Sequence, residues 1–277
     1  MEVHIGHGYL LSQWLSGATN RRTDRHGGSL AHRSIFPLMV LGAVREAVGT
    51  TFTVIVKMNS DDGCAGGLTL DDAVAFAQAI VASNTTDAVV VSAGMVAKNG
   101  FYMLRGAVPL WDMAVAMWHS SVVKAVAVLL FGRWLVPAVP WSECFLMEHA
   151  LAVQRAIQAA TQRPGVTRRV GVILVGGVNS LAACEDALRE GFVAVQMARA
   201  LIREPELVLR MQREAAANAA CSQRRPVVAS GCTQCNRCVL AALSPTASSR
   251  CPLRALDAGV ARPLDVEDLP PTTPLRH

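Results

Sequence analysis

Aromatic residues and charged residues are both scarce in this sequence. Of its 277 residues, 5% are aromatic and 17% are charged, whereas 52% are apolar. A chain of this length and apolar content buries a substantial core. Its Ala- and Val-rich texture favours parallel strands covered by helices over an antiparallel sandwich. The sequence therefore predicts a globular α/β protein.

Runs of basic residues and uninterrupted apolar runs are also missing. The formal net charge is +5, but no five consecutive residues are basic, so nothing indicates a nucleic-acid partner. The most apolar window, Val122 to Val139, is interrupted by Lys124 and Arg133, which argues against a membrane partner. Met1 is followed directly by Glu2, without the pattern of a signal peptide. We therefore expect a soluble, cytoplasmic protein.

Strand and helix patterns alternate along the chain. Five short β-branched or apolar runs are the predicted strands: Glu2–Ile5, Phe52–Met58, Asp87–Ser92, Val170–Val175 and Phe192–Gln196. Helical spacing is found over Ser34–Val48, Thr69–Ala82, Glu143–Ala160 and Ser180–Glu190, whereas Ala93–Ser142 shows no single period. Strands that alternate with helices in this way indicate parallel βα units.

The densest chemistry lies in the first nine residues. If Glu2–Ile5 is a strand, alternation places His4 on the face opposite its two apolar neighbours. The glycines that follow turn the chain, so that His7 and Tyr9 project from the loop at the strand's carboxyl end. Such loops carry the catalytic groups of many α/β enzymes.

Three further stretches follow this cluster along the chain: Leu10–Leu15, Asn20–Asp24 and Gly27–Leu30. Together these residues resemble the old yellow enzyme family of FMN-dependent ene-reductases, in the branch that contains the 2,4-dienoyl-CoA reductases and NADH:flavin oxidoreductases. The resemblance implies a (β/α)8 TIM barrel in which the cluster at His4 ends the fourth strand. The chain would then be an incomplete barrel, with the last five strands present.

The chain is predicted to have three regions. The resemblance implies that residues 1–222 form a partial FMN-binding barrel and 223–253 a short Cys-rich C-terminal extension. Residues 254–277 are Pro-rich and without a period, which predicts a disordered tail. An unclosed barrel exposes two strand edges and an apolar interior. The chain would therefore be a fragment of a longer protein, a product truncated beyond activity, or one part of an assembly or oligomer that supplies the missing strands.

The resemblance also gives the first cluster its catalytic roles. His4 and His7 take the place of two residues that hydrogen-bond the substrate carbonyl or a bound phenolate, and Tyr9 takes the place of the proton donor to the α-carbon. Two N–H donors stabilise the enolate charge that develops when hydride reaches the β-carbon, and a phenol then protonates the carbon as a general acid. The structural alternative is a satisfied histidine and a packed tyrosine near a strand end.

Five residues correspond to the cofactor contacts of the family. Lys57 corresponds to a basic residue beside the flavin ring, where positive charge stabilises the anionic reduced flavin. Gly176 and Gly177 follow one strand, Ala198 and Arg199 follow the next, and the two pairs correspond to the halves of an FMN phosphate site. The structural alternatives are a solvated lysine, a tight βα turn and a capping arginine.

Four cysteines near the C-terminus have metal-ligand spacing. Cys232, Cys235 and Cys238 are followed by Cys251 after twelve residues, and such sulfurs can converge on one tetrahedral site or one cubane cluster. Relatives with a [4Fe–4S] cluster place the third cysteine one residue further along and shorten the last gap by one. A cluster, zinc and no metal are therefore all compatible with the sequence.

The function implied by the resemblance is an FMN-dependent oxidoreductase. Hydride would pass from NAD(P)H through the flavin to the activated C=C bond of a small unsaturated carbonyl or enoyl substrate. The sequence has no G-x-G-x-x-G fingerprint, so the nicotinamide nucleotide would visit as a substrate. Two rival hypotheses are a non-catalytic remnant of such an enzyme and a metal-carrying module built on the tail cysteines.

Overall fold

The computed structural model describes residues 1–118, 120–219, 228–243 and 251–253, so the predicted tail over 254–277 lies outside the described residues. The chain divides into two compact units. The first consists of Met1–Met103, Ser142–Val178 and Ala183–Gln196. The second consists of Leu104–Trp141, Asn179–Ala182 and the described residues from Met197 onward. Each unit has a hydrophobic cluster of its own.

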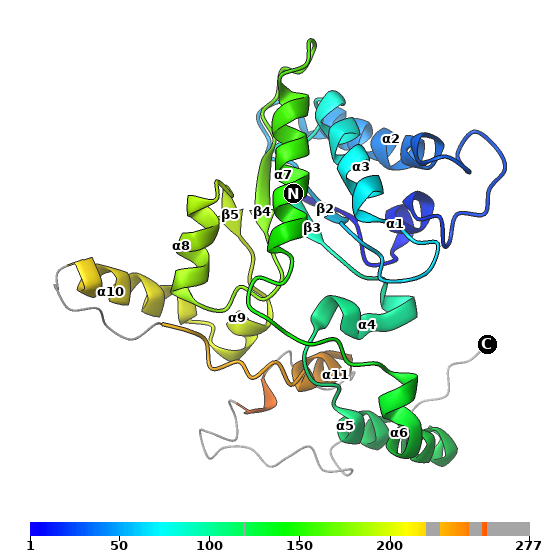
Figure 1. Cartoon of the computed structure of the whole chain (residues 1–277), viewed down its shortest axis with the longest axis vertical. Helices are drawn as coiled ribbons and strands as arrows, with labels where there is room; N and C mark the ends of the chain where they lie inside the picture. Colours follow the sequence, from blue (N-terminus) through cyan, green and yellow to red (C-terminus); the bar gives the residue numbers. More distant parts are fainter. Residues whose placement is uncertain (119, 220–227, 244–250, 254–277) are drawn as a thin grey trace. The chain divides into compact units, whose positions relative to one another are not determined.

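One parallel sheet forms the centre of the first unit (Figure 1). Its strands follow one another in sequence order: β1 (Glu2–Ile5), β2 (Ile55–Asn59), β3 (Ala88–Ser92), β4 (Gly171–Leu174) and β5 (Ala194–Val195). Each strand pairs in parallel with the next. A parallel sheet with no strand out of order is the wall of a barrel rather than a doubly wound sheet.

The sheet is curved, because side chains from its two ends meet across one face. Glu2 Oε2 on β1 accepts a hydrogen bond from Gln196 Nε2, directly after β5, at 2.9 Å. In a flat sheet, four strand spacings would separate these strands by about 19 Å, beyond the reach of the two side chains. The five strands therefore form the partial (β/α)8 barrel that the sequence predicts. We call the side of the sheet that carries Glu2 the concave face.

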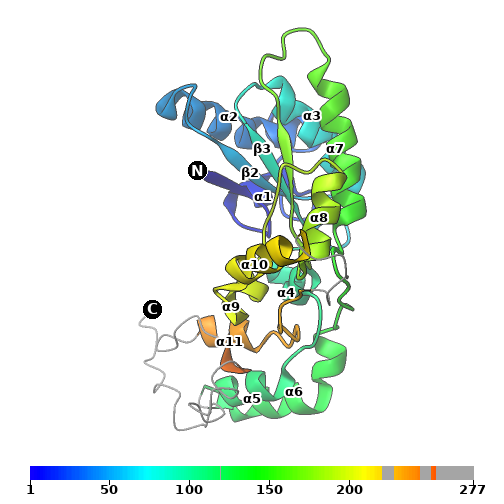
Figure 2. The same ribbon diagram turned by 90° about the vertical axis from the view of Figure 1, so that its left-hand side faces the viewer.

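Helices cover the opposite face of the sheet. α3 (Leu70–Ala82) packs against α7 (Met147–Thr161), and α7 contacts β3 and β4. Figure 2 shows both helices along the same side of the sheet. Beside β1, α1 (Leu10–Leu15) and α2 (Leu30–Val48) pack on each other. Central strand residues that alternate away from Glu2 are fully buried, namely Val56, Val89 and Leu174.

Local signals set the ends of these elements. Thr69 and Asp72 form the capping box that begins α3, as the sequence indicates. α2 begins four residues before the predicted Ser34, because the side chain of Ser29 accepts a hydrogen bond from the backbone N–H of His32. β2 begins at Ile55 rather than at the predicted Phe52, whose side chain is exposed.

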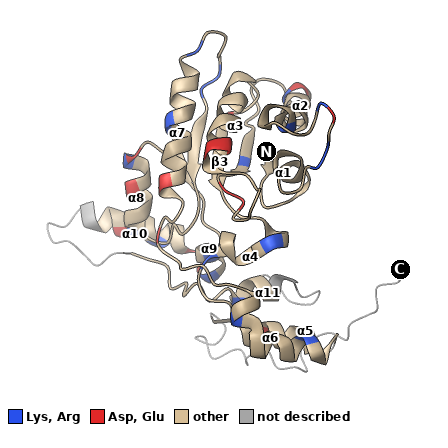
Figure 3. Ribbon diagram, turned by 45° about the vertical axis from the view of Figure 1, so that its right-hand side comes forward, with Lys and Arg blue, Asp and Glu red and all other residues tan. Residues whose placement is uncertain are grey.

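The stretch without a clear period, residues 93–142, contains three helices that the sequence did not predict. They are α4 (Val96–Leu104), α5 (Leu110–Trp118) and α6 (Val122–Leu135). Within the second unit, α5 and α6 pack through Ala114, Ala125 and Val128. Apolar residues also cover the outer side of α6, where Trp134 is 84% exposed, so no amphipathic period marks this helix. Figure 3 shows few charged residues on either helix.

The remaining helices are α8 (Leu181–Arg189), α9 (Arg199–Arg203), α10 (Leu207–Ala219) and α11 (Arg237–Leu243). Within the part of the chain that the structure describes, no helix has both the length and the apolar character needed to cross a membrane.

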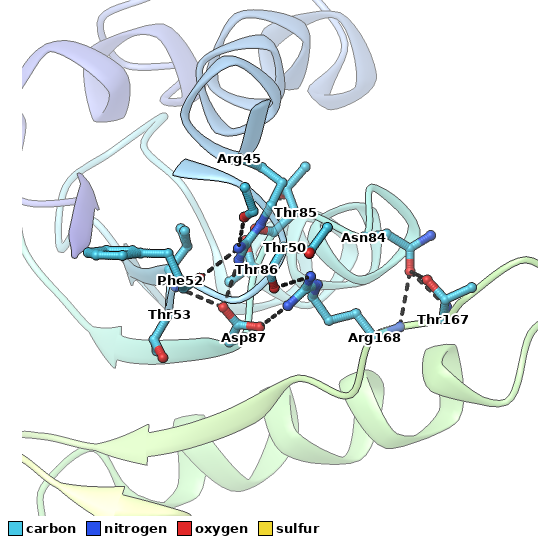
Figure 4. A network of polar contacts seen from close by, with 12 residues as sticks. Arg45, Thr50, Phe52, Thr53, Asn84, Thr85, Thr86, Asp87, Thr167 and Arg168 are labelled. Atoms are coloured by element: carbon cyan, nitrogen blue, oxygen red, sulfur yellow. Dashed lines mark hydrogen bonds and ion pairs between the residues drawn. The ribbon is translucent and has the colours of Figure 1, made fainter. Parts of the chain in front are cut away.

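A charged network closes the amino-terminal edge of the sheet (Figure 4). Asp87, which precedes β3, accepts hydrogen bonds from Arg45 Nη2 on α2 at 2.6 Å and from Val54 N at 2.8 Å, and it pairs with Arg168 before β4. Burial favours the neutral acid, but the bonds from Val54, Arg168 and Arg45 outweigh it and lower the pKa of Asp87. One carboxylate thus joins α2, β2, β3 and the chain before β4.

Candidate active site at the carboxyl edge of the sheet

The loop after β1 is held against the ends of β2 and β3. His7 has a left-handed backbone conformation, with φ 60°, and its N–H donates to Asn59 Oδ1 at 3.1 Å. Its imidazole Nε2 lies 2.7 Å from Ser92 Oγ, and its carbonyl accepts from Val96 N. Three neighbouring strands therefore fix the position of one histidine.

His4 lies on the concave face, as strand alternation predicts. It is in register with Lys57 on β2, and the Lys57 ammonium lies 2.8 Å from Glu2 Oε1. The Nδ1 atom of His4 is buried and has no hydrogen-bond partner. A buried polar atom without a partner is costly, so the chain alone leaves the hydrogen-bonding capacity of this nitrogen unsatisfied.

The two imidazoles and the phenol form one cluster. The ring centroids of His4 and His7 are 4.8 Å apart, and those of His4 and Tyr9 are 5.3 Å apart. His7 is partly buried, whereas Tyr9 is 57% exposed. The structure thus brings together the three residues that the sequence predicts to be catalytic, and adds Lys57 beside them.

Burial keeps both histidines neutral at pH 7. Desolvation, followed by the charges of His4 and Lys57, lowers the pKa of His7 to about 4. The pKa of His4 is also lowered, first by burial and then by Lys57. Glu2 opposes both shifts. A neutral imidazole has one N–H donor and one acceptor, so each ring can donate to a ligand through one nitrogen only.

Sequence reasoning missed the polar residues that support this cluster. Asn59 is buried, and its Nδ2 donates to Asp62 Oδ1 at 2.7 Å and to the carbonyl of Gly94 at 2.8 Å. Its Oδ1 is therefore oriented toward the N–H of His7. Asn59 and Ser92 are the last residues of β2 and β3, and this position at the carboxyl edge was the signal that could have identified them.

Gly176 and Gly177 form a tight turn after β4, with φ 101° and 84°. A Cβ atom on Gly177 would lie 2.6 Å from the carbonyl oxygen of Ser142, and one on Gly176 would lie 2.9 Å from Leu146. Packing against the segment before α7 therefore requires both glycines. The predicted contact of these two glycines with a phosphate stays a prediction.

Ala198 and Arg199 belong to the second unit. Arg199 Nη1 donates to the carbonyl of Arg105 at 3.0 Å and to Asn236 Oδ1 at 2.5 Å, and Nη2 donates to the carbonyl of Leu104. Burial lowers the pKa of this guanidinium. The arginine thus ties α9 to two other segments of its own unit, and the predicted phosphate contact stays a prediction.

The four tail cysteines line one cavity in the second unit. Cys232, Cys235, Cys238 and Cys251 surround it together with Arg199 and Arg203. All four thiols are free, and burial raises the pKa of Cys232 and Cys238. Within the described residues, no group of three or more His, Cys, Asp or Glu side chains has the arrangement of a metal site. The four cysteines thus lie around one cavity, and the metal site stays a prediction.

Comparison with known proteins relates the chain to flavin oxidoreductases. Residues 1–100 match the model of the NADH:flavin oxidoreductase / NADH oxidase family. The chain is 36% identical over 262 residues to the 4,4'-dithiodibutanoate disulfide reductase of Rhodococcus erythropolis, covering 95% of this chain and 58% of that protein. It is 27% identical over 209 residues to the multifunctional alkene reductase/demethylase OYE of Caballeronia cordobensis, covering 75% and 24%. Residues 1–100 thus match this flavin oxidoreductase family, and the chain is similar to proteins named as flavin-dependent or alkene reductases.

Solved structures support the fold. A 2-naphthoyl-CoA reductase in complex with 2-naphthoyl-CoA matches with a TM-score of 0.55 at 21% identity, over 77% of this chain and 26% of that one. A 6-hydroxypseudooxynicotine amine oxidase from Pseudomonas geniculata matches with a TM-score of 0.58 at 19% identity, over 86% and 27%. The chain spans 58% of the length of its Rhodococcus relative and about a quarter of the alkene reductase.

Proposed function

We propose that this chain is part of an FMN-dependent oxidoreductase of the ene-reductase type and contains the residues that bind its substrate. The observation that supports the proposal most directly is the arrangement of His4, His7 and Lys57 at the concave carboxyl edge of the sheet. A fixed cation and two neutral N–H donors are the groups needed beside a flavin and a carbonyl substrate.

The residues of the first unit fit FMN. Lys57 is on the concave face, in register with His4, and its ammonium would stand beside the electron-rich edge of the flavin ring. The backbone N–H groups of the turn at Gly176 and Gly177 would hold the phosphate. When bound, FMN supplies the two-electron chemistry by which a hydride from NAD(P)H reaches an activated C=C bond.

The two histidines would bind the substrate oxygen. Because both imidazoles are neutral, each donates one N–H to a carbonyl without bringing a positive charge into the cluster. Donors that are already oriented stabilise the charge that develops on that oxygen in the transition state. His7 is the better fixed of the two, since its backbone and its ring are both hydrogen-bonded.

Tyr9 would supply the proton. Its ring packs near His4, and 57% of the residue is exposed, so a substrate beside the histidines could reach its hydroxyl. A phenol donates a proton to the α-carbon as a general acid, and solvent then restores it. NAD(P)H and a small unsaturated carbonyl or enoyl compound are the proposed substrates.

The tail cysteines support a second candidate role, that of a metal-carrying module. Four cysteines around one cavity match the ligand count of zinc or of a [4Fe–4S] cluster. The two roles are compatible in one protein, so the presence of a cluster would not exclude the oxidoreductase. A non-catalytic remnant is the alternative if neither group binds.

The visible spectrum of the expressed chain separates these candidates. We expect flavin bands near about 370 and 450 nm, whereas a cluster would add a broad shoulder near about 400 nm. With FMN bound, the chain should oxidise NADH or NADPH faster when 2-cyclohexenone is present. A colourless protein that neither takes up added FMN nor oxidises either nucleotide would support the alternative, a non-catalytic remnant.

A further inference from the structure

We propose that Ser92 is a positioning residue: its hydroxyl donates to His7 Nε2 and so places the single imidazole proton on Nδ1, the nitrogen that would face the substrate oxygen. This inference rests on the proposed function for the role of His7. The hydrogen bond itself is a property of the chain alone.

The contact is short and fixed on both sides. Ser92 Oγ lies 2.7 Å from His7 Nε2, and Ser92 is 5% exposed. The backbone N–H of His7 donates to Asn59 Oδ1, so the ring is attached to a chain segment that cannot shift freely. No described residue bonds to His7 Nδ1, which leaves this nitrogen for a ligand.

The partners available to the Ser92 hydroxyl determine which group donates in its hydrogen bond with His7 Nε2. Within the described residues, His7 Nε2 is the partner of the Ser92 hydroxyl. If the ring donated to Ser92, the buried hydroxyl proton would have no acceptor, at a cost of about 1–3 kcal/mol. If Ser92 donates, both groups are satisfied and Nδ1 carries the ring proton.

Ser60 holds Ser92 in place. The carbonyl oxygen of Ser92 accepts from Ser60 N at 2.7 Å and from Ser60 Oγ at 2.9 Å, and Ser60 is fully buried. Ser60 Oγ also lies 2.9 Å from His149 Nδ1 on α7. The strand end that carries Ser92 is therefore anchored through its backbone. The bond to His7 uses only the Ser92 side chain.

The charges around His7 make the position of its proton decisive. Burial opposes a positive charge on this ring most strongly, His4 and Lys57 add to it, and Glu2 only partly offsets them. The ring is therefore neutral at pH 7 and has a single N–H. With the proton on Nε2, His7 would present a lone pair to the substrate oxygen and repel it.

Nitrogen NMR of the full chain with ¹⁵N-labelled histidine tests the bond directly. His7→Gln identifies the His7 signals, and the wild type should show Nδ1 protonated and Nε2 unprotonated at pH 7.5. Ser92→Ala should make the Nε2–H form the major one, and Ser92→Thr should retain Nδ1–H. The matched control Ser83→Ala, whose hydroxyl donates to the carbonyl of Ile80 away from this site, should leave the tautomer unchanged. Protonation of Nε2 in the wild type, or an unaltered tautomer in Ser92→Ala, would overturn the proposal.

A binding experiment then connects the tautomer to the site. With FMN bound, Ser92→Ala should bind 4-nitrophenolate about 3- to 10-fold more weakly than the wild type, the value of one hydrogen bond, and Ser92→Thr should bind it normally. Equal affinity of Ser92→Ala and the wild type, with the tautomer altered, would overturn the positioning role. If the wild type binds neither FMN nor the phenolate while NMR shows Nδ1–H, the proposed function fails and the assignment of the Ser92–His7 bond stands.

Discussion

Replacement of Asp87 by Asn should destabilise the first unit by about 2–3 kcal/mol. Asparagine keeps the shape of the side chain but removes the charge that Arg45 and Arg168 share. The Asp87 side chain is 25% exposed, and the side chains of Arg45 and Arg168 are 10% and 22% exposed. Loss of one partner of a fully buried ion pair costs about 3–5 kcal/mol, and of an exposed one about 0–1 kcal/mol, so this half-buried network lies between the two.

Two measurements check the Asp87→Asn prediction. Urea unfolding, followed by tryptophan fluorescence, should show a midpoint lowered by about 1 M with an unchanged slope. Hydrogen exchange of the peptide that contains Val54 should accelerate, because its N–H donates to Asp87 Oδ2 at 2.8 Å.

A matched control removes a carboxylate from the surface. Asp186 pairs with Arg189 on α8, but the two side chains are 52% and 72% exposed, so Asp186→Asn should cost less than about 1 kcal/mol. Equal losses of stability in the two variants would refute the conclusion that the Asp87 network holds the edge of the sheet together.

Two further predictions concern the histidine cluster. Tyr9→Phe should slow alkene reduction about 10²–10⁴-fold in stopped flow, because Tyr9 would donate the proton in that half-reaction. Flavin reduction by NADH should be nearly unchanged, since it needs no proton from Tyr9. Equal slowing of both half-reactions would show that Tyr9 is not the proton donor. Protonation of His7 is disfavoured in the folded state, so its contribution to stability is complete above about pH 6.5 and is lost as the pH falls toward about 4, by up to about 3 kcal/mol. His7→Gln should flatten the stability profile over this window, and an equally steep profile in that variant would contradict the pKa shift.

Local patterns predicted most of the sheet. β1 occupies the predicted residues, and alternation alone placed His4 on the face opposite Ile5. The predicted helix Thr69–Ala82 begins at the N-cap of α3 and ends at its last residue. These features depend on neighbours in the sequence, which is why a single sequence is enough to find them.

Contacts between distant residues could not be predicted in the same way. Lys57 meets Glu2 because β1 and β2 pair in one register, and Ser92 meets His7 because the loop after β1 reaches the end of β3. Neither contact can be predicted from the residues nearby in the sequence, because both depend on how distant strands pair. Arg199 shows the same limit, since nothing nearby indicates that backbone carbonyls of another segment bind its guanidinium.

The proposed function requires FMN to bind to the concave face of the sheet. It is tested most directly by titrating the purified chain with FMN and measuring flavin fluorescence, in the wild type, in Lys57→Met and in the control Lys98→Met, whose lysine is exposed on α4. We expect saturable binding of one FMN per chain, about 10- to 100-fold weaker in Lys57→Met, because a hydrogen bond to a charged group is worth about 1.5–3 kcal/mol, and unchanged in Lys98→Met. No saturable binding, or equal affinity in Lys57→Met and the wild type, would contradict the claim.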